Sequence, residues 1–370
     1  MKLVADKNIP YLEGVLNPYF KEVLLLPANE ITSDVVNDAD ALLVRTRTIC
    51  NAKLLEGSKV KFIGSATIGY DHIDINYCNS RGIEWVNAPG CNSGGVQQWV
   101  GAAFIELSNQ LGFNLKSKTL GVVGVGNVGK KVVDIGSALG MKTLCCDPPR
   151  KRDENLPDFV DLKTIAQQSD IVTFHVPLTR DGIDATFHIV DENFINSLKK
   201  DVIILNSSRG EVVDTESLIR SLNQKKLNAV ALDVWENEPN ISLELLNLVN
   251  IATPHVAGYS LEGKVKGTSM VIDSLSRYFN LNIHPWLPSP NPLNKKEIQN
   301  LPSSVIQAIK NSYNILHDTQ VLRENPGNFE KLRSDYRLRR DFTGYTIKGA
   351  NNDEEKIYHK LGFGLISDNP

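Results

Sequence analysis

The most constraining feature of this sequence is a glycine-rich turn at residues 124–129, which reads G-V-G-N-V-G. An almost continuous apolar run at 119–124 leads into it, and a helical pattern begins at Lys130. Such a run is typical of a central strand in a parallel sheet, because helices cover both faces of that strand. The three glycines permit a tight turn, close approach of a ligand to the backbone, and close packing of the helix on the strand. The sequence therefore predicts a strand–turn–helix unit of a doubly wound α/β domain.

An acidic residue follows this unit at the spacing expected for a ribose-binding group. The next predicted strand ends at Asp147, close to the offset of about 20 residues that is typical of dinucleotide-binding folds. A helix amino terminus presents N–H groups to phosphates, and a carboxylate at this position binds ribose hydroxyls and repels a 2′-phosphate. We therefore predict NAD rather than NADP as the cofactor, although Arg150 is close enough in sequence to weaken that preference. The predicted cofactor residues of this unit are Gly124, Gly126, Asn127, Val128, Gly129 and Asp147.

The rest of the chain alternates short apolar runs with helical patterns. Strands are predicted at 3–5, 22–26, 41–44, 61–65, 142–146, 171–175, 202–206, 229–232 and 251–253. Helices are predicted at 96–112, 130–138, 162–168 and 215–224. This alternation indicates the α/β class with two parallel sheets, one before and one after the long buried helix at 96–112.

The composition changes after Tyr278. Four prolines lie between 285 and 292, which predicts a linker without regular structure. In the segment beyond it, Ser303 or Ser304 is expected to cap a helix. One face of that helix is expected to carry Val305, Ile306, Ile309, Tyr313 and Leu316. A basic cluster is expected to form a solvated helix face or ion pairs at the rim of a dimer, and it consists of Lys331, Arg333, Arg337, Arg339 and Arg340.

Composition and charge exclude several classes of protein. The 40 basic and 43 acidic residues leave a formal net charge of -3, without the basic excess typical of a nucleic-acid-binding protein. No stretch approaches the roughly 20 apolar residues needed to cross a bilayer, and the amino terminus does not resemble a secretory signal. The five cysteines are odd in number and include no C-x-x-C pair, so we expect buried free thiols rather than disulfides or a metal site. We therefore expect a cytoplasmic protein that binds no nucleic acid, membrane or metal.

Three motifs follow predicted strands beyond the glycine turn, where the carboxyl ends of parallel strands face a ligand crevice. They are N-S-S-R-G at 206–210, D-V-W-E-N-E-P at 233–239 and T-P-H-V-A-G-Y at 253–259. Oxidation of a 2-hydroxy acid requires a cation for the substrate carboxylate, which Arg209 can supply. It also requires a base of near-neutral pKa, for which His255 is suited, and a carboxylate such as Glu238 to orient the imidazole. Each residue alone could be structural, but the three together after a dinucleotide fold favour catalysis.

The order of these motifs, with H-V-P-L-T at 175–179, resembles that of the NAD-dependent D-2-hydroxyacid dehydrogenases. The resemblance implies that Arg209, Glu238 and His255 are catalytic. It implies a flavodoxin-like substrate domain at 1–93 and 261–284 and a Rossmann-type NAD-binding domain at 94–260. Further contacts to NAD are implied at Val176, Ser207, Ser208, Asp233 and Gly258, with Asp233 beside the nicotinamide amide.

Further segments resemble one branch of this family that dimerises through an additional carboxyl-terminal domain. They are A-T-I-G-Y-D-H at 66–72, A-P-G-C-N at 88–92, C-D-P-P-R at 146–150 and G-Y-S-L-E-G-K at 258–264. This resemblance implies a homodimer, with a small α+β dimerisation domain at 285–370. It also implies oxidation of 4-phospho-D-erythronate at C2 to (R)-3-hydroxy-2-oxo-4-phosphobutanoate in pyridoxal 5′-phosphate biosynthesis, with substrate contacts at Thr46, Thr67 and Tyr259. The chain departs from the branch at 97–99, where Q-Q-W replaces V-E-Y, and we assign Gln98 no catalytic role.

Alternatives remain open on the sequence alone. Arg45 and Arg47 flank Thr46 and are equally compatible with binding the substrate phosphate and with ordinary surface charge. The substrate could be another D-2-hydroxy acid, such as 3-phosphoglycerate, hydroxypyruvate or glyoxylate. A weakly catalytic NAD-sensing protein is the alternative from a different class, and the complete set of Arg209, Glu238 and His255 argues against it.

Overall fold

The computed structural model describes residues 1–289, 291–294, 297–301, 304–348 and 350–366. The chain forms two compact units, of which the first comprises Met1–Asn92 with Leu261–Lys295 and the second comprises Ser93–Ser260 with Lys296–Pro370. The carboxyl-terminal segment from Lys296 therefore shares a unit with the glycine-rich turn. A separate third domain that begins at residue 285 stays a prediction.

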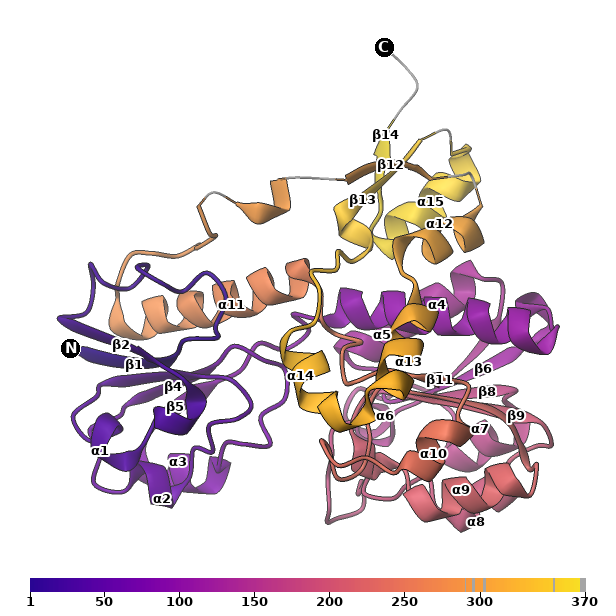
Figure 1. The fold of residues 1–370 in the computed structure, drawn as a ribbon, viewed down its shortest axis with the longest axis horizontal. Helices are drawn as coiled ribbons and strands as arrows, with labels where there is room; N and C mark the ends of the chain where they lie inside the picture. The colour runs from indigo at the N-terminus through magenta and orange to yellow at the C-terminus, as the bar shows by residue number, and fades with distance from the viewer. Residues whose placement is uncertain (290, 295–296, 302–303, 349, 367–370) are drawn as a thin grey trace. The chain divides into compact units, whose positions relative to one another are not determined.

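The first unit is built on a five-stranded parallel sheet in the order β2-β1-β3-β4-β5 (Figure 1). The strands are β1 (Lys2–Asp6), β2 (Glu22–Leu26), β3 (Ala41–Val44), β4 (Phe62–Ser65) and β5 (Glu84–Val86). This order is that of a flavodoxin-like sheet, in which the order of the strands reverses between β1 and β3 while all strands stay parallel. The predicted parallel sheet before the long helix is confirmed.

Both faces of this sheet are apolar, because successive residues of a strand point to opposite faces. Leu3 and Ala5 of β1 lie in one core with Val271 and Leu275 of helix α11 (Leu261–Phe279). Val4 lies in the core on the other face, together with buried residues of the three short helices. These helices are α1 (Ser33–Val36), α2 (Ala52–Leu55) and α3 (Ile75–Arg81).

The second unit contains a six-stranded parallel sheet in the order β11-β10-β9-β8-β6-β7. The strands are β6 (Thr119–Val123), β7 (Lys142–Cys146), β8 (Ile171–Phe174), β9 (Val202–Asn206), β10 (Leu227–Leu232) and β11 (Ile251–Ala252). The order reverses at β6, which has β7 on one side and β8 on the other. In doubly wound folds a ligand binds at the carboxyl ends of the strands beside such a switch point. The predicted Rossmann-type sheet is confirmed.

Helices cover both faces of this second sheet. The helices of this unit before the carboxyl-terminal segment are α4 (Ser93–Leu111), α5 (Asn127–Ala138), α6 (Pro148–Asp153), α7 (Leu162–Gln168), α8 (Glu192–Ser197), α9 (Thr215–Asn223) and α10 (Leu243–Leu248). The predicted long helix is α4, and it is buried over most of its length. Its Trp99 and Phe104 side chains are fully inaccessible to solvent.

The carboxyl-terminal segment adds a three-stranded parallel sheet and further helices to the second unit (Figure 1). Its elements are β12 (Glu297–Leu301), α12 (Val305–Ser312), α13 (Ile315–Glu324), α14 (Phe329–Ser334), β13 (Tyr345–Lys348), α15 (Asn352–Leu361) and β14 (Gly364–Ile366). Ala308 of α12 and Tyr358 of α15 are buried in the same apolar core as Trp99 of α4. Of the two predicted caps, Ser304 precedes α12 without a capping hydrogen bond, and Ser303 lies outside the described residues.

The helix predicted after the linker is interrupted, so that prediction was wrong. Helix α12 ends before Tyr313, whose backbone is extended, and the Asn314 side chain caps α13. The predicted apolar face is divided by this break, and Ile306 and Leu316 are exposed at 43% and 38%. The apolar spacing continues through Asn314, but an asparagine side chain competes for backbone N–H groups and favours the start of a new helix.

The expectation of a solvated helix face was wrong for part of the basic cluster, and the alternative, ion pairs at the rim of a dimer, stays a prediction. Arg339 and Arg340 are only 5% and 9% exposed. Arg337 forms an ion pair with the buried Asp318. These residues follow α14 in an irregular stretch, so helical periodicity does not determine which side chains are buried.

The five cysteines are free thiols, and all except Cys145 are buried. The expectation of buried free thiols is therefore confirmed for four of them and was wrong for Cys145, which is partly exposed. Among the described residues, no helix is both long enough and apolar enough to span a membrane.

Candidate active site

The glycine-rich turn joins β6 to α5 at the switch point of the second sheet. A Cβ on Gly124 would lie 2.5 Å from the carbonyl oxygen of His175, and a Cβ on Gly129 would lie 2.0 Å from the carbonyl oxygen of Gly124, so the turn leaves no room for side chains there. A Cβ on Gly126, in contrast, would meet nothing within 4 Å. Gly126 is also the cap residue of α5, and no side chain caps this helix. An open cradle at an uncapped helix amino terminus fits a pyrophosphate.

Asp147 lies at the end of β7 and supports this turn. Its carboxylate accepts hydrogen bonds from the backbone N–H groups of Val125, at 2.8 Å, and of Arg150, at 3.2 Å. A carboxylate offers about four acceptor positions, so capacity for ribose hydroxyls remains. Arg150 makes two side-chain bonds to Glu154 and one to the Val125 carbonyl. The cation that could have favoured a 2′-phosphate therefore already has partners.

The end of β8 lies against the glycine turn. The Val176 side chain lies close to Gly124, because a Cβ on Gly124 would lie 2.8 Å from Cγ1 of Val176. The His175 ring shares a hydrogen bond of 2.9 Å with the Thr173 hydroxyl, and burial lowers the pKa of His175 to about 3. The ring is therefore neutral at physiological pH.

Arg209 lies on the loop that follows β9, and Asn206 shapes this loop. The Asn206 side-chain oxygen accepts hydrogen bonds from the backbone and hydroxyl of Ser208, and its amide group donates to the Arg209 carbonyl at 2.8 Å. The Arg209 guanidinium also donates to the Ser208 carbonyl at 2.8 Å. The hydroxyl oxygen of Ser207 is inaccessible to solvent and has no hydrogen-bond partner among the described residues. Asn206 thus fixes the shape of the loop that carries Arg209, which the sequence did not lead us to predict.

Glu238 and His255 form a hydrogen-bonded pair, as the sequence predicts. The Nδ1 atom of His255 lies 2.7 Å from Oε2 of Glu238. The Trp235 backbone N–H donates to Oε1 of Glu238 at 3.0 Å, which fixes the other carboxylate oxygen. Burial alone would raise the pKa of Glu238, but the charge and hydrogen bond of His255, together with Arg333, hold this pKa below its usual value. The carboxylate is therefore ionised at neutral pH beside the imidazole.

His255 has a left-handed backbone, with φ of 57°. For a residue other than glycine this conformation costs about 1–3 kcal/mol and persists only when neighbouring contacts enforce it. Asp233, which is 1% exposed, provides such contacts, because its carboxylate accepts the N–H groups of Val256, at 2.8 Å, and Ala257, at 2.9 Å. It also accepts the Thr253 hydroxyl at 2.5 Å. Burial raises the pKa of Asp233 against the lowering effect of His255 and these hydrogen bonds.

The predicted residues divide between the two units. Arg209, Glu238, His255 and all of the predicted cofactor residues belong to the second unit, and so does Tyr259, whose backbone N–H donates to the Val256 carbonyl at 2.9 Å. Thr46 and Thr67 belong to the first unit, at the carboxyl ends of β3 and β4.

In the first unit, hydroxyl groups connect β4 to His72. The Thr67 hydroxyl donates to the Gly69 carbonyl at 3.1 Å and lies 2.8 Å from the Ser65 hydroxyl. The latter lies 3.1 Å from Nε2 of His72. The Arg45 guanidinium donates to the Asn8 carbonyl at 3.3 Å. Thr46 is exposed.

Fold and site define the class of protein together. A doubly wound sheet with a glycine turn at its switch point, and a histidine–carboxylate pair at neighbouring strand ends, is the architecture of an NAD-dependent dehydrogenase. The family described as "D-isomer specific 2-hydroxyacid dehydrogenase, NAD binding domain" matches residues 95–257. A second family, "Domain of unknown function (DUF3410)", matches residues 289–362.

Curated relatives match along nearly the whole chain. An erythronate-4-phosphate dehydrogenase of Bacteroides fragilis is 45% identical over 94% of this chain and 99% of its own length. The protein of the same name from Porphyromonas gingivalis is 39% identical, over 98% of this chain and 100% of its own length. The chain therefore belongs to the erythronate-4-phosphate dehydrogenase family, within the NAD-dependent D-2-hydroxyacid dehydrogenases.

A solved structure shows the same fold at lower identity. The D-lactate dehydrogenase of Aquifex aeolicus, complexed with NAD and lactic acid, has a TM-score of 0.63 and 24% identity. It covers 77% of this chain and 97% of its own.

Proposed function

We propose that this enzyme oxidises 4-phospho-D-erythronate at C2 to (R)-3-hydroxy-2-oxo-4-phosphobutanoate, in the synthesis of pyridoxal 5′-phosphate. The observation that carries the proposal is the pair formed by Glu238 and His255 in the second unit, which also holds Arg209 and the glycine turn. The name of the matched relatives supports the particular substrate.

His255 is proposed to act as the base. Because Glu238 accepts a hydrogen bond at Nδ1, the proton of the neutral imidazole lies on Nδ1, and the lone pair of Nε2 takes up the C2 hydroxyl proton. Glu238 stabilises the imidazolium that forms, because a carboxylate beside an imidazole favours its charged form. The Arg209 guanidinium is proposed to bind the substrate carboxylate with two parallel hydrogen bonds.

The cofactor residues are proposed to act as the sequence predicts. Gly124, Gly126 and Gly129, together with the first N–H groups of α5, would hold the pyrophosphate, and Asp147 the adenosine ribose. The proposed contacts to the rest of NAD come from Asn127, Val128, Val176, Ser207, Ser208, Asp233 and Gly258. Bound NAD supplies the acceptor for the C2 hydride.

Substrate contacts are proposed at Thr46, Thr67 and Tyr259, with Arg45 and Arg47 as the candidates for the phosphate. A monodentate or bidentate guanidinium contact is a common way to bind phosphate. We also propose a cytoplasmic homodimer that associates through the carboxyl-terminal segment. Sedimentation of the full chain measures the assembly, and a monomer at micromolar concentration would contradict it.

Replacement of the base tests the mechanism. His255→Ala should abolish turnover and leave the Kd for NAD nearly unchanged, because the pyrophosphate cradle is on another loop. His188→Ala is the matched control, since His188 forms a similar pair with Glu236, at 2.6 Å, outside the proposed machinery. Equal loss of turnover and of NAD affinity in His255→Ala would contradict the assignment.

A substrate panel tests the specificity. NADH formation from 4-phospho-D-erythronate should far exceed NADH formation from 3-phosphoglycerate. It should also far exceed NADH formation from glycerate and glycolate, the hydroxy acids that correspond to hydroxypyruvate and glyoxylate. The reverse order would reject the proposed substrate and retain the class of reaction. Absence of turnover with every 2-hydroxy acid would favour an NAD-sensing protein.

A further inference from the structure

The irregular stretch after α14 contains a buried arginine that contacts the catalytic loop. Arg339 is 5% exposed. Its guanidinium donates to the backbone carbonyls of Ala257 at 2.5 Å, Val256 at 3.2 Å and Tyr259 at 3.3 Å. All three residues lie within four positions after His255, in the same turn. A residue more than 80 positions away in the sequence therefore bonds to the loop that carries the proposed base.

Two tyrosine rings and one carboxylate hold Arg339 in place. Its guanidinium carbon lies 4.2 Å from the centroid of the Tyr313 ring and 5.9 Å from that of the Tyr336 ring. Both tyrosine hydroxyls donate to the same oxygen of Asp318, at 2.7 and 2.6 Å. A planar guanidinium stacks on aromatic rings while it donates several hydrogen bonds at fixed angles, which a lysine ammonium cannot reproduce.

The Val256–Ala257 peptide group is bonded at both ends. Its N–H, that of Ala257, donates to the Asp233 carboxylate, and its carbonyl, that of Val256, accepts from Arg339. In the two adjacent peptide groups, the N–H of Val256 also donates to Asp233 and the carbonyl of Ala257 also accepts from Arg339. Opposite charges thus hold the two ends of the central peptide group, in a turn that begins with the left-handed backbone of His255. Contacts of this kind are what keep a strained backbone in place.

We propose that Arg339 is a positioning residue that keeps the turn at 255–259 in place. It thereby maintains the hydrogen bond between the His255 imidazole and the Glu238 carboxylate. The matched family at 289–362 would then contribute to catalysis in addition to any role in assembly. A second arginine of the same segment lies beside the pair, because Arg333 is 3.6 Å from Oε2 of Glu238. This inference rests on the proposed role of His255 as the base.

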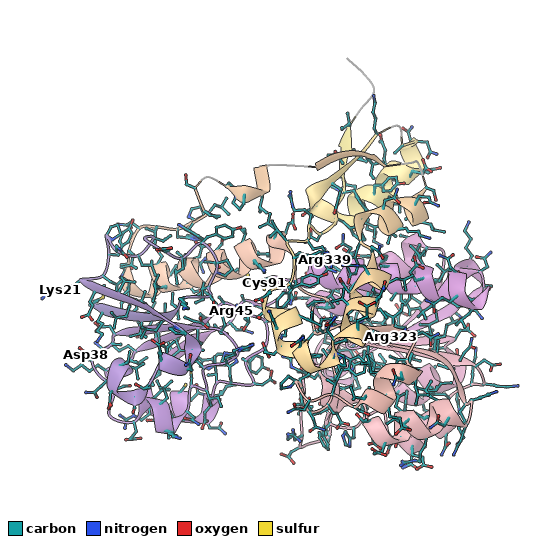
Figure 2. The ribbon with its side chains drawn as sticks, viewed as in Figure 1. Lys21, Asp38, Arg45, Cys91, Arg323 and Arg339 are labelled. Atoms are coloured by element: carbon teal, nitrogen blue, oxygen red, sulfur yellow. The ribbon has the colours of Figure 1, made fainter. Side chains whose placement is uncertain are left out.

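The test compares Arg339→Met with a matched arginine of the same segment. Arg323, on α13, also donates to a backbone carbonyl, that of Val249, but outside the catalytic loop (Figure 2 labels both arginines). In Arg339→Met, kcat per folded chain should fall about a hundredfold, the loss expected when a catalytic group moves by about 1 Å. Arg323→Met should lower the thermal midpoint while kcat stays near that of the unmodified enzyme.

Two further readouts separate positioning from general stability. Amide hydrogen exchange should accelerate over residues 254–260 in Arg339→Met and not in Arg323→Met, because the amides of Val256 and Ala257 lose part of their support. Arg339→Lys, which retains one cation, should recover part of kcat. It also serves as the test variant if Arg339→Met does not fold.

The outcomes distinguish this inference from the proposed function. Loss of turnover in His255→Ala with an unchanged kcat in both Arg339 variants would overturn the inference alone. If 4-phospho-D-erythronate is not turned over, the proposed substrate fails, and kcat is compared on the 2-hydroxy acid that the substrate panel identifies. Equal kcat losses in Arg339→Met and Arg323→Met would show that Arg339 contributes only to stability and would reject the positioning role.

Discussion

Gly210 allows a direct test of how the loops that carry the proposed catalytic residues are held, because it carries no reactive group itself. It directly follows Arg209 and packs against the loop that carries Glu238. A Cβ at this position would lie 2.0 Å from the Trp235 carbonyl oxygen, 2.1 Å from its carbonyl carbon and 2.5 Å from the Glu236 nitrogen. All three neighbours are backbone atoms, so no side-chain rotation relieves the contact.

The size of the effect of Gly210→Ala follows from these distances. Ordinary van der Waals contact begins at 3.4 Å, so the two backbones must separate by about 1.4 Å in a close-packed interior. The Trp235 backbone N–H holds Glu238, and its indole N–H holds the Thr253 carbonyl at 3.0 Å. The displacement therefore reaches the proposed acid–base pair. A shift of about 1 Å costs about a hundredfold in rate, and the overpacking itself costs about 1–3 kcal/mol of stability.

The assay is kcat with saturating NAD and substrate, together with the Kd for NAD from fluorescence titration. We expect kcat of Gly210→Ala to fall at least a hundredfold, with the Kd for NAD within a few-fold of the original value. Gly327→Ala is the control, because a Cβ there meets nothing within 4 Å and Gly327 lies in the same unit. Full turnover by Gly210→Ala would refute the reasoning, since it would show that the two loops can part without disturbing catalysis.

Two further predictions concern protonation. The folded-state pKa of Glu238 is lowered, so its contribution to stability is present above the unfolded pKa of about 4.3 and is lost as the pH falls through the folded value. The difference in urea midpoint between the original chain and Glu238→Gln should therefore be largest near neutral pH and shrink in acid, and an increase in acid would contradict this. Burial raises the pKa of Cys50 and Cys146 to about 12 and that of Cys91 to about 11, and only the thiolate is reactive. A thiol reagent at pH 8 should label the partly exposed Cys145 first, and rapid labelling of a second thiol in the native protein would contradict the buried geometry.

Much of the fold could be predicted from local sequence patterns. The apolar strands and the glycine turn at 124–129 are local features, because a buried parallel strand is apolar along its whole length and a tight turn requires glycine at fixed positions. The same holds for the pairing of Glu238 with His255. Parallel strands end at one edge of a sheet, so residues that follow β10 and β11 are neighbours in any such fold.

The support of these residues could not be predicted in this way. Asn206 bonds within its own loop, and a strand-end asparagine is a signal that could have identified it. Arg339 gave no such signal, because it lies in an irregular stretch where no periodicity separates buried from exposed positions. Its interpretation as part of a solvated helix face failed for that reason.

The sequence by itself determined the class of fold, the position of the cofactor turn and the proposed acid–base pair, because each depends on short-range patterns and on the common direction of parallel strands. Only the tertiary structure decided what holds the turn that carries the proposed base. Asp233 and Arg339 support the two ends of the Val256–Ala257 peptide group, and Arg339 reaches it from a segment beyond the linker. Such a contact depends on where the segment packs on the second unit, and no local pattern in the chain encodes that placement.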